Sequence, residues 1–159
     1  MPSTYTPISQ FAITSNTAAI TFSSIPSTYT DLVLVTNFAA TTALNNGVTF
    51  NSDTGSNYSD TDLGTNGTAV SSSRSAFTYI RAGYVDTASE RAMSIVNIMN
   101  YANATTNKSV LLRWNSDSYS YARFGLWRNT AAITSITCTA IGGSFTANST
   151  FTLYGIKAA

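Results

Sequence analysis

Apolar residues alternate with polar ones in short segments along most of the chain, and this period of two constrains the fold most strongly. In the segment 150–156, Phe151 and Leu153 fall on one face, and Tyr154 and Ile156 fall on the other. Similar alternation is found in residues 18–22, 77–85, 110–115 and 136–140. Because successive side chains of a strand point to opposite faces of a sheet, the pattern predicts β-strands.

Eight to ten such segments are separated by turn-rich stretches, which predicts an all-β fold, an antiparallel β-sandwich of jelly-roll type. The closing segment 150–156 is expected to lie inside a sheet. Residues 91–101 are ambiguous, because Met93, Val96 and Asn100 fit one helix face. The two β-branched residues and the internal Asn residues of this stretch favour a strand.

Two segments, Leu32–Val35 and Val110–Trp114, are apolar on both faces, and they carry more apolar surface than a two-layer sandwich must bury. The surplus is expected to face a sister subunit or to be covered by residues 51–75, a polar stretch predicted as a surface excursion. Asn46-Gly47 lies between apolar runs, which predicts a two-residue hairpin turn.

The length of 159 residues is that of one domain. We expect a single β-sandwich over residues 11–159, preceded by an N-terminal arm over residues 1–10. Pro2 and Pro7 favour extended backbone in this arm. Tyr5, Pro7 and Ile8 are its candidate interface residues, and the alternative is a frayed terminus.

Only 9% of the residues are charged, against roughly 25% in ordinary soluble domains. The net charge is +1 and the basic residues are dispersed, so the chain lacks the electrostatic footprint of a nucleic-acid-binding protein.

No apolar run approaches the ~20 residues that span a bilayer, and the first ten residues do not form a Sec signal. Cys138 is the single cysteine and is interpreted as a small buried hydrophobe. We expect synthesis in a reducing cytoplasm.

The sequence holds no histidine, which removes Ser-His-Asp and Cys-His arrangements and the usual imidazole ligands. No phosphate-binding glycine motif is present. The seven acidic residues are enough for the two carboxylates of a glycosidase, but none lies in an apolar setting that would raise its pKa. The chain is therefore expected to be no enzyme and to need no cofactor.

The best candidate for a metal site is the segment "DTGSNYSDTD", in which Asp53, Asn57, Asp60 and Asp62 offer hard oxygen ligands to Ca²⁺. The EF-hand spacing and its bidentate Glu are absent. Asp and Asn also favour turns through bonds to their own backbone, and this second interpretation is preferred.

Nine Tyr, eight Phe and two Trp make aromatic residues abundant. Tyr58, Tyr119 and Tyr121 are candidates for exposed rings, which suit sugar or protein binding beside Ser and Asn. The competing interpretation places most aromatic rings in the core and in subunit contacts. Arg113, Arg123 and Arg128 are expected to pair with the few acidic residues or with a partner subunit.

Four blocks of the chain, "IPSTYTDLVLV", "FNSDTGSNYSDT", "GLWRNTAAITSIT" and "GGSFTANSTFTLYGIKAA", occur in this order. Together with the stretches between them they extend over well over half of the sequence. They resemble small virion proteins of tailed bacteriophages, especially phages of aquatic bacteria. The resemblance implies a virion-surface β-domain, of capsid decoration (cement) or fibre type, and it implies no particular site residues.

The function expected from this resemblance is that of a structural virion protein, a decoration protein that stabilises the phage head from outside. The alternative is a tail or head fibre component that binds a host surface glycan. The expected partners are sister copies in a homotrimer and the major capsid protein or other virion proteins, with assembly in the host bacterial cytoplasm. A charge-poor domain has little repulsion to keep copies apart, which fits self-association.

Overall fold

The computed structural model describes residues 4–157, which form β-strands and loops. The twelve strands are β1 (Tyr5–Ala12), β2 (Ala19–Phe22), β3 (Asp31–Ala39), β4 (Leu44–Phe50), β5 (Tyr58–Thr65), β6 (Val70–Phe77), β7 (Ile80–Val85), β8 (Arg91–Ile98), β9 (Lys108–Asn115), β10 (Ser120–Trp127), β11 (Ile136–Ile141) and β12 (Thr150–Ile156). Residues 4–157 contain no helix long and apolar enough to cross a membrane.

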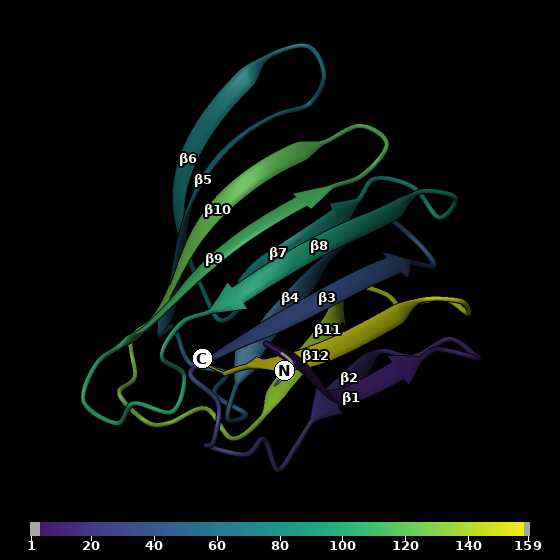
Figure 1. Cartoon of the computed structure of the whole chain (residues 1–159). Coiled ribbons are helices and arrows are strands. Elements are labelled where there is room, and N and C mark those ends of the chain that lie inside the picture. Colours follow the sequence, from purple (N-terminus) through teal and green to yellow (C-terminus); the bar gives the residue numbers. More distant parts are fainter. Residues whose placement is uncertain (1–3, 158–159) are drawn as a thin grey trace.

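The strands form two antiparallel sheets that pack face to face (Figure 1). The large sheet has eight strands in the order β1-β12-β3-β8-β9-β10-β5-β6, and the small sheet has four in the order β2-β11-β4-β7. Neighbours in both sheets are often distant in sequence, as in a jelly roll. The prediction of an antiparallel β-sandwich is confirmed, with twelve strands in place of eight to ten.

The core fills the space between the two sheets, where the inward faces of the alternating strands meet. Along β9 the inward residues Val110 and Leu112 are buried, whereas their neighbours Ser109 and Leu111 are exposed. Cys138 is fully buried in β11, as predicted, and burial raises the pKa of its thiol to about 12. The period of two in the sequence is therefore the period of burial.

The last strand, β12, lies inside the large sheet between β1 and β3, as the sequence predicted. Phe151 and Leu153 are fully buried, and the opposite face of the strand carries the half-buried Tyr154. Residues 91–98 form strand β8 and not a helix, so the preference for a strand in this ambiguous segment is also confirmed.

The N-terminal arm needs correction. Residues Tyr5–Ala12 form β1, an edge strand paired antiparallel with β12, so residues 5–10 belong to the sandwich. A bulge between Pro7 and Ser9 interrupts the pairing. Pro7 is tolerated there because an edge strand and a bulge are where a missing N–H costs least. Residues 1–3, the start of the expected arm, lie outside the described residues.

Two turn predictions are wrong. Residues 51–75, expected to be a surface excursion, hold β5 and most of β6, which extend the large sheet and leave its outer face uncovered. Asn46 and Gly47 lie inside β4, and not in a hairpin turn, at a point where the register against β7 shifts. Gly47 fits closely there, because a Cβ would lie 3.0 Å from the side chains of Ile141 and Tyr79.

The two sheets differ in width, and this difference creates the candidate site. The β5–β6 hairpin forms one edge of the large sheet and projects beyond the small sheet (Figure 1). The edge strand of the small sheet, β7, lies against β5, β8 and β9 of the large sheet. Where the large sheet overhangs β7, its inward face turns from apolar to polar, as Asp60 and Asp62 replace core residues.

Candidate ligand-binding cleft

A cleft of about 380 Å³ lies between β7 and the overhanging strands β9, β10, β5 and β6. It is lined by Asn45, Asp62, Ser71, Ser73, Arg81, Tyr84, Trp114, Tyr119, Tyr121 and Arg123. These residues combine four aromatic rings with a few polar groups that point into the cleft. The volume of the cleft lies within the range of small-molecule sites.

Strand register brings the lining together from distant parts of the sequence. Tyr121 in β10 is paired with Trp114 in β9 on one side and with Gly64 in β5 on the other. Gly64 in turn is paired with Ser71 in β6. Paired residues share one face of a sheet, so these four positions form a row across the inward face.

The aromatic part of the cleft is a cluster of four rings. Trp114 and Tyr121 stack with centroids 5.2 Å apart and an interplanar angle of 11°. Tyr119 lies 6.2 Å from Trp114 and 6.4 Å from Tyr121, and Tyr84 meets Tyr119 edge to face at 5.5 Å. Trp114 is buried, whereas the three tyrosines are half-buried and keep part of their surface open to the cleft.

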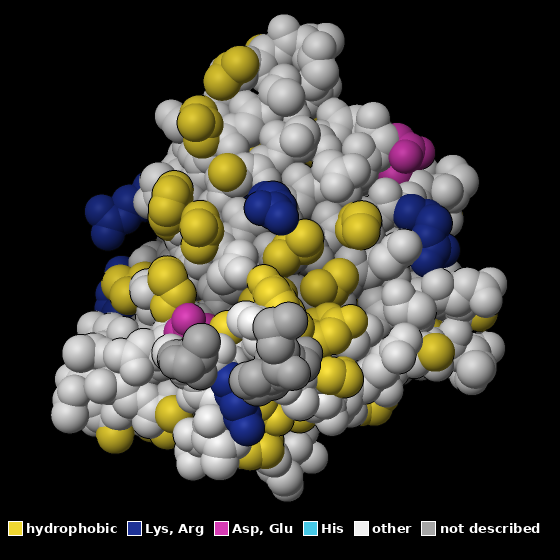
Figure 2. Space-filling model, in the orientation of Figure 1, with side chains coloured by type: hydrophobic (Ala, Val, Ile, Leu, Met, Phe, Trp, Pro, Cys, Tyr) yellow, Lys and Arg dark blue, Asp and Glu magenta, His cyan; other side chains and the backbone are white. Residues whose placement is uncertain are grey.

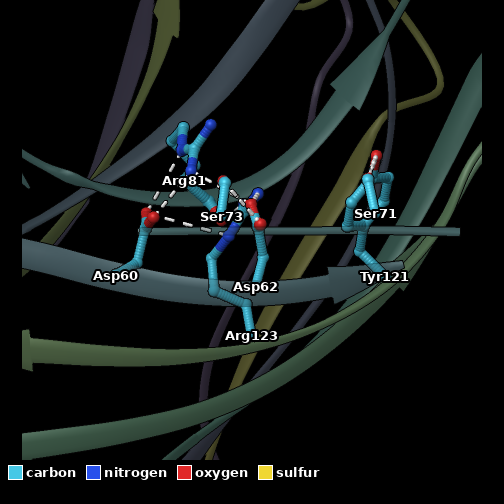
Figure 3. A network of polar contacts seen from close by, with 7 residues as sticks. All are labelled: Asp60, Asp62, Ser71, Ser73, Arg81, Tyr121 and Arg123. Carbon is cyan, nitrogen blue, oxygen red and sulfur yellow. Dashed lines mark hydrogen bonds and ion pairs between the residues drawn. The ribbon is translucent and has the colours of Figure 1, made fainter. Parts of the chain in front are cut away.

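The polar part of the cleft is a four-membered ion-pair network beside these rings (Figure 3). Arg81 of β7 donates to Asp60 at 2.6 and 3.2 Å and to Asp62 at 3.1 Å. Arg123 of β10 donates to Asp62 at 2.7 Å and also to the backbone carbonyl of Arg81. Ser73 of β6 donates to the other oxygen of Asp62 at 2.7 Å. The network therefore joins the two sheets where the core ends.

Burial and ion pairing have opposite effects on the pKa values of this network. Burial alone would raise the pKa of Asp62, but the bonds from Arg123 and Ser73 outweigh it, so the pKa lies below its usual value. Burial lowers the pKa of Arg123, and the bond to Asp62 offsets only part of this. The bonds to Asp60 and Asp62 raise the pKa of Arg81 in spite of its burial. The network thus pairs two carboxyl side chains with two guanidinium groups.

The β7–β8 and β9–β10 turns form the rim of the cleft, and one buried carboxylate, that of Glu90, holds them together. Glu90 follows the β7–β8 turn and accepts hydrogen bonds from the backbone N–H groups of Asp86 and Ser118. These bonds tie the β7–β8 turn to the β9–β10 turn, which carries Tyr119. Burial would raise the pKa of Glu90, but the polar groups around its carboxylate, among them the Ser116 hydroxyl and these two backbone N–H groups, bring it below its usual value. Tyr84 donates to the exposed Asp86 at 2.9 Å.

The four residues of the predicted calcium site divide into two groups. Asp53 accepts bonds from Asn57, from the backbone of Gly55 and, at 2.7 Å, from the indole of Trp127. Asp60 and Asp62 lie in β5 and are paired with arginine. Within residues 4–157 no group of three or more Asp, Glu, Cys or His side chains is placed to hold a metal ion.

The other residues singled out in the sequence lie in three different settings. Tyr119 and Tyr121 line the cleft, whereas Tyr58, expected to be exposed, is fully buried beneath Trp127 and Phe50. Tyr5 is 56% exposed in β1 and packs edge to face on Tyr154. Pro7 is exposed and Ile8 is half-buried in the same strand.

The three arginines singled out in the sequence, Arg113, Arg123 and Arg128, have different surroundings. Arg123 pairs with acidic residues as expected, and Arg128 donates to Ser59 at 2.8 Å. Arg113 is exposed on the outward face of β9. Sequence reasoning missed Arg81, Tyr84 and Trp114 as cleft residues. The alternation expected in residues 77–85, with Ile80 and Tyr84 on one face, is wrong in β7. Ile80, Ala82 and Val85 are buried, whereas Arg81 and Tyr84 both line the cleft.

The outward face of the large sheet carries exposed apolar side chains, which Figure 2 shows scattered over the surface among a few basic groups. Phe124 is 64% exposed, Leu63 58%, Met93 46% and Leu111 39%. Leu111 and Phe124 are direct cross-strand neighbours. Of the surplus apolar residues that the sequence indicated, Leu111 is exposed on this face, whereas Val33 is buried and Val35 is half-buried.

No protein-family model matches the chain, and no curated protein matches it. Among solved structures, the chain is similar to the alginate lyase Aly36B, with a TM-score of 0.38, 10% identity, and 92% of this chain and 78% of that chain covered. The marine PL-14 alginate lyase from Aplysia kurodai gives a TM-score of 0.36 with 8% identity, covering 92% and 80%. Caenorhabditis elegans galectin LEC-6 gives 0.29 with 10% identity, covering 96% and 91%.

Proposed function

We propose that this chain is a carbohydrate-binding β-sandwich domain of a phage particle, of the fibre type that recognises a host surface glycan. The observation that carries the proposal is the row of partly open aromatic rings, Tyr119, Tyr121 and Tyr84, beside hydroxyl and amide side chains in one cleft. The apolar face of a sugar ring packs on an aromatic ring, and its hydroxyl groups bond to neighbouring polar side chains. The place on a phage particle is supported by the sequence blocks that resemble virion proteins.

Binding without catalysis is the second part of this proposal. A general acid or base needs a carboxyl that can exchange its proton near the working pH. Asp62 is held ionised by the hydrogen bonds from Arg123 and Ser73, with a pKa below its usual value. Asp62 is the carboxylate among the lining residues of the cleft, and it is not poised to transfer a proton to a bound sugar.

A titration of the protein with soluble neutral oligosaccharides tests this function. We expect saturable binding that Tyr121→Ala or Tyr119→Ala weakens at least tenfold. Tyr154→Ala is the matched control, because Tyr154 is also half-buried but lies on β12, outside the cleft lining. Equal binding by Tyr121→Ala and Tyr154→Ala would contradict the assignment of the cleft. Electron microscopy of phage particles labelled with antibody against the chain tests the location.

A structural role on the outside of the phage head is the second candidate, and the exposed apolar face of the large sheet favours it. In this role the face packs against a sister copy within a homotrimer. Aromatic, Met and Arg side chains are enriched in protein contacts and Lys is depleted, and the face presents Phe124, Met93 and Arg113.

The distribution of charged residues supports the packing of a sister copy against this face. The outward positions of β8, β9, β10, β5 and β6 carry Arg74, Arg91 and Arg113 and no acidic residue. Exposed Asp86 and Asp117 lie in the β7–β8 and β9–β10 turns, so a neighbouring copy can supply the opposite charge.

Sedimentation velocity at protein concentrations of tens of micromolar tests this arrangement. It is expected to show trimers, and the substitution Phe124→Ser or Arg113→Glu is expected to dissociate them. A monomer at every concentration would rule out this arrangement.

A further inference from the structure

The charges of the cleft are already satisfied inside the protein, and this limits the kind of glycan that fits. Arg81 and Arg123 are the cations among the lining residues, and both are bound to Asp60 and Asp62. Both carboxylates are almost completely buried, with residue exposures of 2% for Asp60 and 5% for Asp62. A guanidinium group that turned toward a ligand anion would leave a buried carboxylate without its partner, which is strongly unfavourable.

The rim adds negative charge and no cation. Asp86 is exposed and bonded to the hydroxyl of Tyr84, and Glu90 lies behind it, bonded to the two turns that frame the rings. A carboxylate or sulfate on a sugar bound against Tyr84 and Tyr119 would therefore meet like charge at short range. Like charges at a few ångströms repel substantially even under partial solvent screening.

The uncharged groups of the cleft suit hydroxyl groups instead. Asn45 lines the cleft with an amide that both donates and accepts, and no hydrogen bond to it from the rest of residues 4–157 is found. Ser71 is exposed and makes one long contact, 3.4 Å, with the hydroxyl of Tyr121. Sugar hydroxyls also both donate and accept, so they can bond to these groups without disturbing the ion pairs.

We propose that the cleft selects uncharged hexose units and rejects glycans that carry carboxylate or sulfate groups. This inference rests on the proposed carbohydrate function and specifies its substrate class. The selectivity follows from the paired arginines: a site for acidic sugars needs a cation that is free to face the ligand, and this cleft has none among its lining residues.

Matched oligosaccharides that differ only in charge test the inference. Neutral gluco-, manno- and galacto-oligosaccharides are compared with the same chains oxidised at C6, in which a carboxylate replaces the primary alcohol. The readout is tryptophan fluorescence, because Trp114 stacks on Tyr121 in the cleft. We expect at least one neutral chain to bind, and its oxidised form to bind at least tenfold more weakly at low salt. The difference is expected to narrow at high salt.

Two charge variants test the physical cause. Asp86→Asn removes one rim charge without touching the ion pairs, and Asp62→Asn leaves the two arginines with one carboxylate. Both are expected to raise the affinity for the oxidised chain relative to the neutral one, by about threefold or more. Asp31→Asn is the control, because Asp31 lies in β3 and bonds to the backbone of Asn100, outside the cleft. Since Asp62→Asn also weakens the fold, Asp86→Asn keeps the test independent of stability.

The outcomes separate the two proposals. If an oxidised chain binds as tightly as its neutral form or more tightly, the selectivity inference is wrong and the carbohydrate function stands. If neither form of any chain binds, the proposed function fails, and the inference fails with it. If neutral chains bind selectively but Asp86→Asn and Asp62→Asn leave the ratio unchanged, the proposed cause of the selectivity is wrong.

Discussion

The ring of Tyr121 lies directly against the backbone of Gly64 on the neighbouring strand. A Cβ at position 64 would be 2.2 Å from Cδ1 of this ring and 2.6 Å from the carbonyl oxygen of Ser120. Glycine is therefore required at position 64 for steric reasons, and it fixes where the ring of Tyr121 stands in the cleft.

Gly64→Ala is expected to displace Tyr121 and so to weaken glycan binding about tenfold, while costing about 1–3 kcal/mol of stability through the forced shift. Oligosaccharide titration and urea unfolding measure the two effects. Gly55→Ala is the control, because Gly55 lies in a loop and its Cβ would meet only the side chains of Asn57 and Asp53 at 3.0 Å or more. Unchanged binding by Gly64→Ala would show that the ring position is not needed.

Asp62→Asn is expected to lower the free energy of unfolding by about 2–3 kcal/mol. Removing one partner of a buried ion pair typically costs about 3–5 kcal/mol. The expected cost is smaller here because Asp60 remains 3.7 Å from Arg123 and Arg81 is partly exposed. Denaturant unfolding at neutral pH measures the loss. A change below about 0.5 kcal/mol, the size of an ordinary surface substitution, would argue against a stabilising role for the network.

Glu90→Gln is expected to cost about 1.5 kcal/mol at pH 7, since hydrogen bonds to a charged group contribute about 1.5–3 kcal/mol. The folded-state pKa of Glu90 lies below its usual value. Its contribution is therefore fully present above the unfolded-state pKa of about 4.3 and disappears as the pH falls through the folded-state pKa. Melting curves of both proteins from pH 7 to pH 2 should converge at the acidic end. A gap that widens with acid would reverse the assigned sign.

Asn46→Leu is expected to stabilise the protein by about 1–2 kcal/mol. Asn46 is fully buried in β4, and neither its amide nitrogen nor its amide oxygen has a hydrogen-bond partner within residues 4–157. A buried polar group without a partner costs about 1–3 kcal/mol, and an apolar side chain of similar size avoids that cost. Val48→Ala, next inward on the same strand, should destabilise as a core truncation. A destabilised Asn46→Leu protein would show that the amide is satisfied in solution.

The strands were predictable from the sequence where one face of the strand is buried in the core and the other face is not. β12 and β9 alternate cleanly because one face of each strand meets the small sheet. β5 was missed because its inward residues Asp60 and Asp62 are charged and paired with arginines, so the sequence of this strand resembles that of a polar loop. The failure of the hydrophobic pattern therefore coincides with the candidate site.

The composition of the cleft was only partly predictable. Tyr119 and Tyr121 stand out in the sequence as tyrosines in a Ser-rich segment, and both line the cleft. The partnership of Arg81 with Asp60, 21 residues away, depends on which strand edges meet across the two sheets. Such pairings depend on long-range register, which alternation within one segment does not specify.

The most direct measurement of the central claim is the backbone amide NMR spectrum of the protein, recorded with increasing amounts of a neutral oligosaccharide that binds. We expect the shifted signals to belong to the cleft strands, centred on Trp114, Tyr119, Tyr121 and Ser71. We also expect signals of the outward face around Phe124 to stay unchanged. Shifts confined to the outward face, or no shifts with any neutral oligosaccharide, would contradict the claim.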